Sequence, residues 1–226
     1  MWCVPELTTE YIERMEDILN LLAKPRRRSE PVVALDERPV QLHGSARPGR
    51  AAAPGRVARR DYEYIRNGTA NVYCIVEPRG GRHWTHATPN RKAPFFVRAL
   101  KKIASAYPRA RKIHLVVDNL NIHCEKSLET VLGKRVGRRL WRRFKVHYTP
   151  KHGSWLNPAE IEVGLWSREC LGGDRVPALD QLCARTRAWN RRANRLNREI
   201  NWGFTKNDAR RAFRYKRTST TIRWEH

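Results

Sequence analysis

The chain has 226 residues, of which 46 are lysine or arginine and 22 are aspartate or glutamate, so its formal net charge is +24. With 40% hydrophobic residues and eight tryptophans it can bury a core, which excludes wholesale disorder. No apolar run approaches the roughly 18 residues of a membrane span, and the first residues lack the apolar region of a secretion signal. The five scattered cysteines form no C-x-x-C pair, so we expect a cytoplasmic protein with reduced thiols and no membrane partner.

The large basic excess favours a polyanionic partner, and nucleic acid is the commonest one. Three alternatives remain open on charge alone. These are a ribosomal role, a membrane-surface role, and an arginine content raised by a GC-rich genome without any selection for binding.

The hydrophobic pattern predicts helices and strands that alternate along the chain. In chain order we expect a helix over 8–23, a strand over 31–36, an exposed basic loop over 43–60, strands over 70–77 and 82–87 joined by a turn at 78–81, a helix over 94–107, a strand over 114–118, a helix over 124–133, a strand over 144–149, and helices over 158–170, over 178–199 and in the tail 201–217. This order is typical of a mixed α/β fold with helices on the faces of a central sheet.

Three acidic residues are candidates for chemistry because of their positions. Asp36 and Asp118 each follow an apolar strand, and Glu160 lies in the first turns of a predicted helix. An acid placed there is costly unless cations or donors meet it. Two strand-end aspartates and a nearby glutamate offer the hard oxygen ligands that a pair of Mg²⁺ or Mn²⁺ ions requires, and such a pair can promote phosphodiester displacement.

Each acid also has a plain structural explanation as a turn former, a helix cap or a partner of the helix dipole. Glu37 and Glu162 are neighbours that compete for the roles of Asp36 and Glu160. Alternation along a strand, and the 3.6-residue turn of a helix, allow only one member of each pair to face a common site.

Five segments together carry a specific resemblance. They are ERMEDILNLL followed by LDERPVQL, PGRVARRDYEYIRNGTANVYC, LVVDNLNIHCEKSL, YTPKHGSWLNPAEIEVGLWSRECL, and WNRRANR followed by INWGFTKNDARR. In these segments, which run from about residue 5 to 212, the chain resembles the catalytic domain of bacterial insertion-sequence transposases of the mariner superfamily, in the six-thirty insertion-sequence branch.

The resemblance implies an RNase H-like (retroviral-integrase-like) fold, with a mixed five-stranded sheet flanked by helices. It implies an Asp-Asp-Glu site formed by Asp36, Asp118 and Glu160, with two Mg²⁺ per site that Mn²⁺ can replace. It further implies hydrolysis of DNA at transposon ends and transfer of the freed 3′-hydroxyl to target DNA, typically at a TA step, by a homodimer on DNA.

The expected organisation is a linker helix over 1–29, a catalytic domain over 30–177 and a basic helical extension over 178–226. Full-length members carry a helix-turn-helix region that reads terminal repeats; we expect this region to be absent here and a separate polypeptide to be able to supply it. The alternative function is a truncated or split remnant that binds DNA without autonomous catalysis. A ribonuclease of the same fold is a third hypothesis, disfavoured by the LNPAE motif.

Supporting residues follow the same motifs. Asn119 and His123 come after the second acid, where His123 could contact a phosphate or cap the next helix, and Asn157 is expected to cap the helix that carries Glu160. Three basic clusters and the loop residue Lys151 are expected to contact DNA phosphates. They are Arg56, Arg59 and Arg60, flanked by Arg47 and Arg50; Lys134, Arg138, Arg139, Arg142 and Arg143, with Arg135; and Arg187, Arg191 and Arg192, flanked by Arg185 and Arg195.

Overall fold

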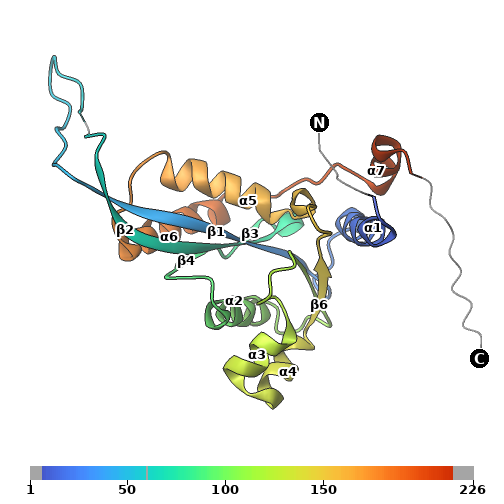
Figure 1. The fold of residues 1–226 in the computed structure, drawn as a ribbon. Coiled ribbons are helices and arrows are strands. Elements are labelled where there is room, and N and C mark those ends of the chain that lie inside the picture. Colours follow the sequence, from blue (N-terminus) through green and yellow to red (C-terminus); the bar gives the residue numbers. More distant parts are fainter. Residues whose placement is uncertain (1–6, 60, 216–226) are drawn as a thin grey trace, which may run out of the picture.

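The computed structural model describes residues 7–59 and 61–215, which form one mixed sheet with helices on both faces (Figure 1). The strands are β1 (Val32–Ser45), β2 (Tyr64–Glu77), β3 (Arg82–His83), β4 (His86–Thr88), β5 (Ile113–Val117) and β6 (Phe144–Tyr148). The helices are α1 (Thr9–Ala23), α2 (Ala93–Ala106), α3 (Glu125–Leu132), α4 (Lys134–Trp141), α5 (Ala159–Trp166), α6 (Leu179–Arg195) and α7 (Lys206–Phe213). Shorter helical turns are η1 (Pro78–Gly80), η2 (Ser154–Leu156) and η3 (Ser167–Leu171).

The sheet has the order β3-β2-β1-β5-β6, in which β1 and β2 are antiparallel while β1, β5 and β6 are parallel. The predicted mixed α/β sheet is therefore confirmed. The predicted strand over 82–87, however, is two short strands that both pair with β2, so the sheet has six strands rather than five. Between them the Thr85 hydroxyl accepts from the Ile75 N–H (3.4 Å), which interrupts the regular ladder.

β1 is much longer than the predicted strand over 31–36. It runs to Ser45 and forms a long antiparallel hairpin with β2, so the exposed basic loop begins only at residue 46. The extra length follows from alternation, because Val40 and Leu42 are buried while Pro39 and Gln41 are exposed. Pro39 is tolerated since β5 pairs only with the first three residues of β1, which leaves that edge open. Figure 1 shows the loop over 46–63, here called the basic arm, projecting beyond the sheet.

Alternation in β1 also distributes the core between the two faces of the sheet. Val33 and Leu35 pack with α2, and Ala34 packs on the opposite face with α1 and the start of α5. Farther along, Val40 and Leu42 pack with buried side chains of α5 and α6. Figure 1 agrees, with α2, α3 and α4 on one side of the sheet and α5 on the other.

The basic segment over 134–143, for which no element was predicted, contains α4, which packs against α3 between β5 and β6. Gly137 permits this contact because a Cβ there would lie 2.7 Å from the backbone of Leu128. At the other end of the described chain, α7 lies beside α1, where Arg210 forms two hydrogen bonds with the Glu16 carboxylate (2.7 and 3.0 Å). Within residues 7–59 and 61–215, no helix is long and apolar enough to cross a bilayer.

Candidate active site

Asp36 lies where β1 separates from β5. The parallel pairing of the two strands ends at Ala34, whereas β1 stays paired with β2 at Asp36 and beyond. The Oδ1 atom of Asp36 accepts from the Glu37 N–H (2.8 Å), and its Oδ2 atom accepts from Nδ2 of Asn157 (3.3 Å). The carboxylate therefore sits at the opening between two parallel strands, which is where chemistry gathers in such sheets.

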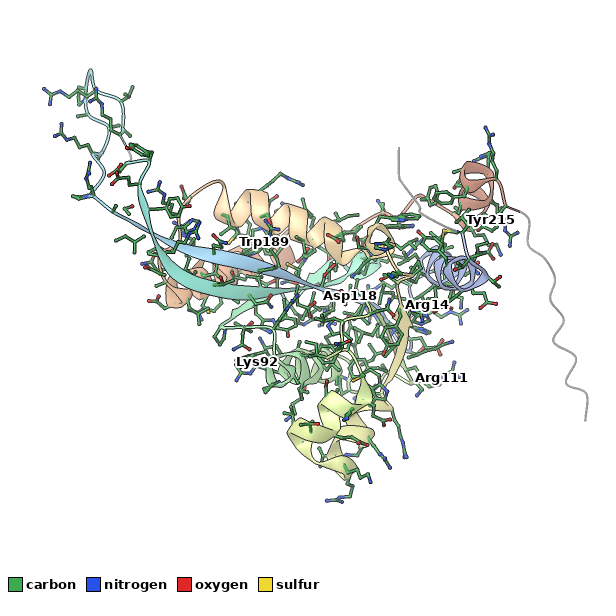
Figure 2. The ribbon with its side chains drawn as sticks, in the orientation of Figure 1. Arg14, Lys92, Arg111, Asp118, Trp189 and Tyr215 are labelled. Atoms are coloured by element: carbon green, nitrogen blue, oxygen red, sulfur yellow. The ribbon has the colours of Figure 1, made fainter. Side chains whose placement is uncertain are left out.

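Asp118 follows the last residue of β5 and is close to this opening. Its Oδ1 atom accepts from the Leu120 N–H (3.1 Å) and lies 2.8 Å from Nδ1 of His123, which also contacts the Asp118 backbone carbonyl (3.2 Å), while 42% of the Asp118 side chain is exposed. The hydrogen bond from His123 is the main reason that the pKa of Asp118 is lowered. Asp118 is therefore held as a carboxylate that solvent can reach. Figure 2 shows it near the middle of the molecule, with Arg14 of α1 to one side.

Glu160 lies in the first turn of α5, is exposed, and approaches Asp36. Burial raises the pKa of Asp36 to about 7, and the negative charge of Glu160 is the next largest cause. The charges of Glu37 and Asp118 raise it further, against a hydrogen bond from the Glu37 N–H. Four carboxylates are thus near enough to interact, and we call Asp36, Glu37, Asp118 and Glu160 the acidic cluster.

The members of the acidic cluster are not equally close. In the described part of the chain, one group of three metal-ligating residues has ligand atoms within 4.8 Å of one another, namely Glu37, Asp118 and His123. Asp36 and Glu160 lie outside that group. Carboxylate oxygens are nevertheless the donors that Mg²⁺ and Mn²⁺ prefer, and a cation would relieve the repulsion that raises the pKa of Asp36. The donor set therefore fits a hard divalent cation.

His123 is fully buried and packs on Phe96 of α2, with 4.7 Å between ring centroids. Its Nε2 atom lies 2.9 Å from Oε1 of Glu37, while Nδ1 contacts Asp118. Burial lowers the pKa of His123, but the hydrogen bonds to Asp118 and Glu37 outweigh it and raise the pKa to about 10. Both ring nitrogens are therefore engaged with carboxylates, and neither is left to contact a phosphate.

Two asparagines tie the acidic cluster to its surroundings. Asn157 is buried; its Nδ2 donates to the Leu35 carbonyl (2.9 Å), and its Oδ1 accepts from the Ala159 N–H (3.1 Å) at the start of α5. Asn119 accepts from Arg14 (2.6 Å) and donates to the Thr149 carbonyl (2.6 Å). Asn157 thus fixes α5 on β1, and Asn119 fixes the loop after β5.

Glu162 faces away from the acidic cluster. Its fully buried carboxylate accepts from the Thr85 hydroxyl (2.7 Å) and lies 2.9 Å from Nδ1 of His83. This contact anchors α5 to the β3–β4 edge of the sheet. Burial distinguishes the two glutamates of α5, because Glu160 is open to solvent and Glu162 is not.

Sequence reasoning missed the pairing of Glu37 with His123 and the contact of Arg14 with Asn119. The sequence places Glu37 directly after Asp36 and His123 five residues after Asp118, but the contact between them depends on where β1 and β5 part. Arg14 had no signal in the sequence, because α1 is 105 residues away from Asn119 in the chain.

Some of the residues predicted to contact DNA already form hydrogen bonds or ion pairs within the protein, and others are exposed. Arg143 donates to the Tyr107 carbonyl (2.6 Å), Arg138 pairs with Glu129 and Arg192 pairs with Glu169 (2.9 Å). The remaining ones described are exposed: Arg56 and Arg59 on the basic arm, Lys134, Arg139 and Arg142 on or beside α4, Arg187 and Arg191 on α6, and Lys151 after β6. Arg60 lies outside the described residues. Lys151 borders a groove that Arg14 and Asn119, the residue after Asp118, also line.

Comparisons with known proteins agree with this geometry. The family model of the DDE superfamily endonucleases matches residues 31–183. An insertion element IS630 uncharacterized 39 kDa protein of Shigella sonnei is 28% identical over 96 residues, which span 42% of this chain and 23% of that protein.

Two solved structures have a similar fold, which is RNase H-like. They are a pre-cleavage Mos1 transpososome (TM-score 0.52, 15% identity) and the Mos1 strand transfer complex (TM-score 0.51, 16% identity). Each match covers 87% of this chain, and 62% and 61% of the respective Mos1 chains, so the chain spans less than two thirds of these relatives. The resemblance and the fold expected from the sequence are confirmed: the chain belongs to the DDE superfamily endonucleases.

Proposed function

We propose that the chain is the catalytic domain of a DNA transposase in which Asp36, Asp118 and Glu160 hold two Mg²⁺ ions, which Mn²⁺ can replace. The observation that carries the proposal is the crowding of carboxylates around Asp36, whose pKa rises to about 7. Crowded carboxylates at the open end of parallel strands are unfavourable alone and become favourable around hard cations. Membership of the endonuclease family supports the same chemistry.

Bound there, two divalent cations would supply the positive charge that stabilises the attacking and leaving oxygens of a phosphodiester displacement. The protein residues hold the geometry. Asp36 and Asp118 are attached to neighbouring strands, and Asn157 fixes the helix of Glu160 against β1. In the first reaction water attacks the phosphodiester at a transposon end and releases a 3′-hydroxyl. In the second that hydroxyl attacks a target phosphodiester, typically at a TA step, and the target's own 3′-oxygen leaves.

DNA is the proposed partner, with its phosphates meeting exposed cations of this chain. Lys151 borders the groove that Asn119 also lines, and Arg139 and Arg142 lie on or beside α4. Such contacts position DNA without reading its sequence and weaken steeply with salt. Because two ends must be cut, we propose a homodimer on DNA, with end recognition by a helix-turn-helix region that could be a separate polypeptide. An enzyme of this kind would act at the bacterial nucleoid in the cytoplasm.

Nicking of supercoiled plasmid tests the proposal. We expect purified protein to nick DNA with Mg²⁺ or Mn²⁺ and to lose this activity in Asp36→Asn, Asp118→Asn and Glu160→Gln. Asp180→Asn, an exposed acid in the first turn of α6, is the matched control and should nick like the wild type. Nicking that persists in all three variants refutes the assignment. Salt-sensitive DNA binding without nicking supports instead a remnant that binds DNA without catalysis.

A further inference from the structure

A series of side-chain contacts, from Glu37 through His123, connects β1 to Asp118 across the opening of the sheet. We propose that Glu37 is a positioning residue that acts through His123 to hold the Asp118 carboxylate in its place. The inference rests on the proposed function, because it matters to the reaction only if Asp118 binds a cation. It gives Glu37 a role that differs from those of the three acids.

These contacts restrain one carboxylate oxygen of Asp118 and leave the other without a hydrogen-bond partner among the described residues. Oδ1 accepts from the Leu120 N–H (3.1 Å) and lies 2.8 Å from Nδ1 of His123, which also contacts the backbone carbonyl of Asp118 (3.2 Å). Within the described residues Oδ2 of Asp118 has no hydrogen-bond partner, so this oxygen is the one left for a cation. Two donors on Oδ1 fix the rotation of the carboxylate, and that rotation decides where Oδ2 points.

Glu37 in turn fixes the imidazole. Its Oε1 atom lies 2.9 Å from Nε2 of His123, and only 4% of the Glu37 side chain is exposed. The Phe96 ring packs against the imidazole at a tilt of 38° and restrains it further. With a carboxylate at each nitrogen, the ring has one orientation that satisfies both. A change at Glu37 therefore alters the orientation of the Asp118 carboxylate.

The location explains why a side-chain link is required. Backbone pairing of β1 with β5 ends at Ala34 and Val116, so no ladder joins the strands where the acidic cluster begins. The link from Glu37 through His123 to Asp118 spans this opening. The link thus holds the acid-bearing ends of β1 and β5 together, as backbone hydrogen bonds hold the residues before them.

A rival role, that Glu37 itself is a cation ligand, fits the contacts less well. Its carboxylate is nearly inaccessible and already bound to His123. A cation there would have to displace His123, and so release the Oδ1 atom of Asp118. The two roles differ in how mutations combine, because a positioning residue has no effect once the residue through which it acts is gone.

The test compares Glu37→Gln with Glu77→Gln. Glu77, the last residue of β2, is equally buried, with 3% of its side chain exposed, and is held by Arg26 (2.9 Å) and the Tyr107 hydroxyl (2.7 Å). Mn²⁺ binding without DNA is measured by electron paramagnetic resonance, and nicking is measured against Mg²⁺ concentration. Loss of an outer-shell partner weakens metal binding about 10–100-fold. We expect that loss in Glu37→Gln and less than about a twofold change in Glu77→Gln, although both variants lower the free energy of unfolding.

Adding His123→Gln completes the test. In that background Glu37→Gln should cause no further loss of Mn²⁺ affinity, whereas losses that multiply would make Glu37 an independent ligand. Equal Mn²⁺ affinity in the two glutamate variants would overturn the inference. If the wild type neither binds Mn²⁺ nor nicks DNA, the proposed function fails. The positioning role of Glu37 is then tested by the ¹³C NMR chemical shift of the Asp118 carboxyl. A shift in Glu37→Gln but not in Glu77→Gln supports positioning, and an unchanged signal overturns it.

Discussion

Substituting Asn157 tests quantitatively how much its contacts, which hold α5 on β1, contribute to the free energy of unfolding. Replacing it with alanine removes the acceptor for the Ala159 N–H and the donor to the buried Leu35 carbonyl. Loss of an acceptor at a helix start costs about 1 kcal/mol, and a buried carbonyl left without a donor costs about 1–3 kcal/mol. We therefore expect Asn157→Ala to lower the free energy of unfolding by about 2–4 kcal/mol, because Asn157 is itself buried and water cannot replace its contacts.

Asn157→Asp separates the two contributions. The introduced carboxylate still accepts from the Ala159 N–H, but it cannot donate, and it faces Oδ2 of Asp36 at the place where Nδ2 now lies 3.3 Å away. At pH 8, above the raised pKa of about 7, Asp36 is ionised and the two charges repel. Asn157→Asp should therefore be less stable than Asn157→Ala, although it is closer to asparagine in size.

Urea unfolding of both variants in EDTA at pH 8, followed by tryptophan fluorescence, measures these differences. Nicking by Asn157→Ala should also fall, because the helix that carries Glu160 is no longer fixed on β1. The reasoning is refuted if Asn157→Ala loses less than about 1 kcal/mol, or if Asn157→Asp is as stable as the wild type.

Three further predictions follow from contacts described above. Gly137→Ala should lower the thermal midpoint despite the better helix propensity of alanine, because the new Cβ would meet the Leu128 backbone at 2.7 Å; a higher midpoint would contradict this packing. A hydrogen bond with His147 lowers the pKa of Asp17, so this contact stabilises the protein above the unfolded pKa and is lost as the pH falls through the folded pKa. The stability difference between wild type and Asp17→Asn, less than about 1 kcal/mol for this half-exposed pair, should therefore shrink in urea titrations between pH 6 and pH 3, and a constant difference would refute it. Replacing Arg139 and Arg142 with alanine should reduce the slope of log DNA affinity against log salt by about 2, whereas Arg192→Ala, already paired with Glu169, should change it less.

The regular elements could be predicted because their patterns are local. Alternation and helical spacing gave the positions of β5, α2 and α6 to within a few residues. The pattern failed where pairing with a distant strand decided the outcome, as in β1 beyond Asp36 and in the division between β3 and β4. α4 was missed because it is only eight residues long, has Gly137 in its middle, and carries just three apolar side chains among its basic ones.

For the candidate site, the sequence supplied the positions of the acids but not their connections. Asp36 and Asp118 could be expected at neighbouring strand ends, and their assignment as ligands stays a prediction. The burial that separates Glu162 from Glu160 depends on His83, which is 79 residues away from Glu162. The pairing of Glu37 with His123 depends on where two strands part, which no local pattern encodes.

The contacts of α6 determine what a shortened gene product would retain. Leu182 and Trp189 cover Trp166 of α5 and Cys74 of β2, and Asn194 makes reciprocal hydrogen bonds with the backbone of His83 (2.9 and 3.0 Å). A frameshift just after residue 177 would leave the three acids in the translated product but expose this apolar surface to water. It would also remove the support for the His83 ring that anchors α5. We expect such a product to aggregate or to be degraded. A gene whose reading frame ends there is therefore expected to encode no active protein, even though the three acids are intact.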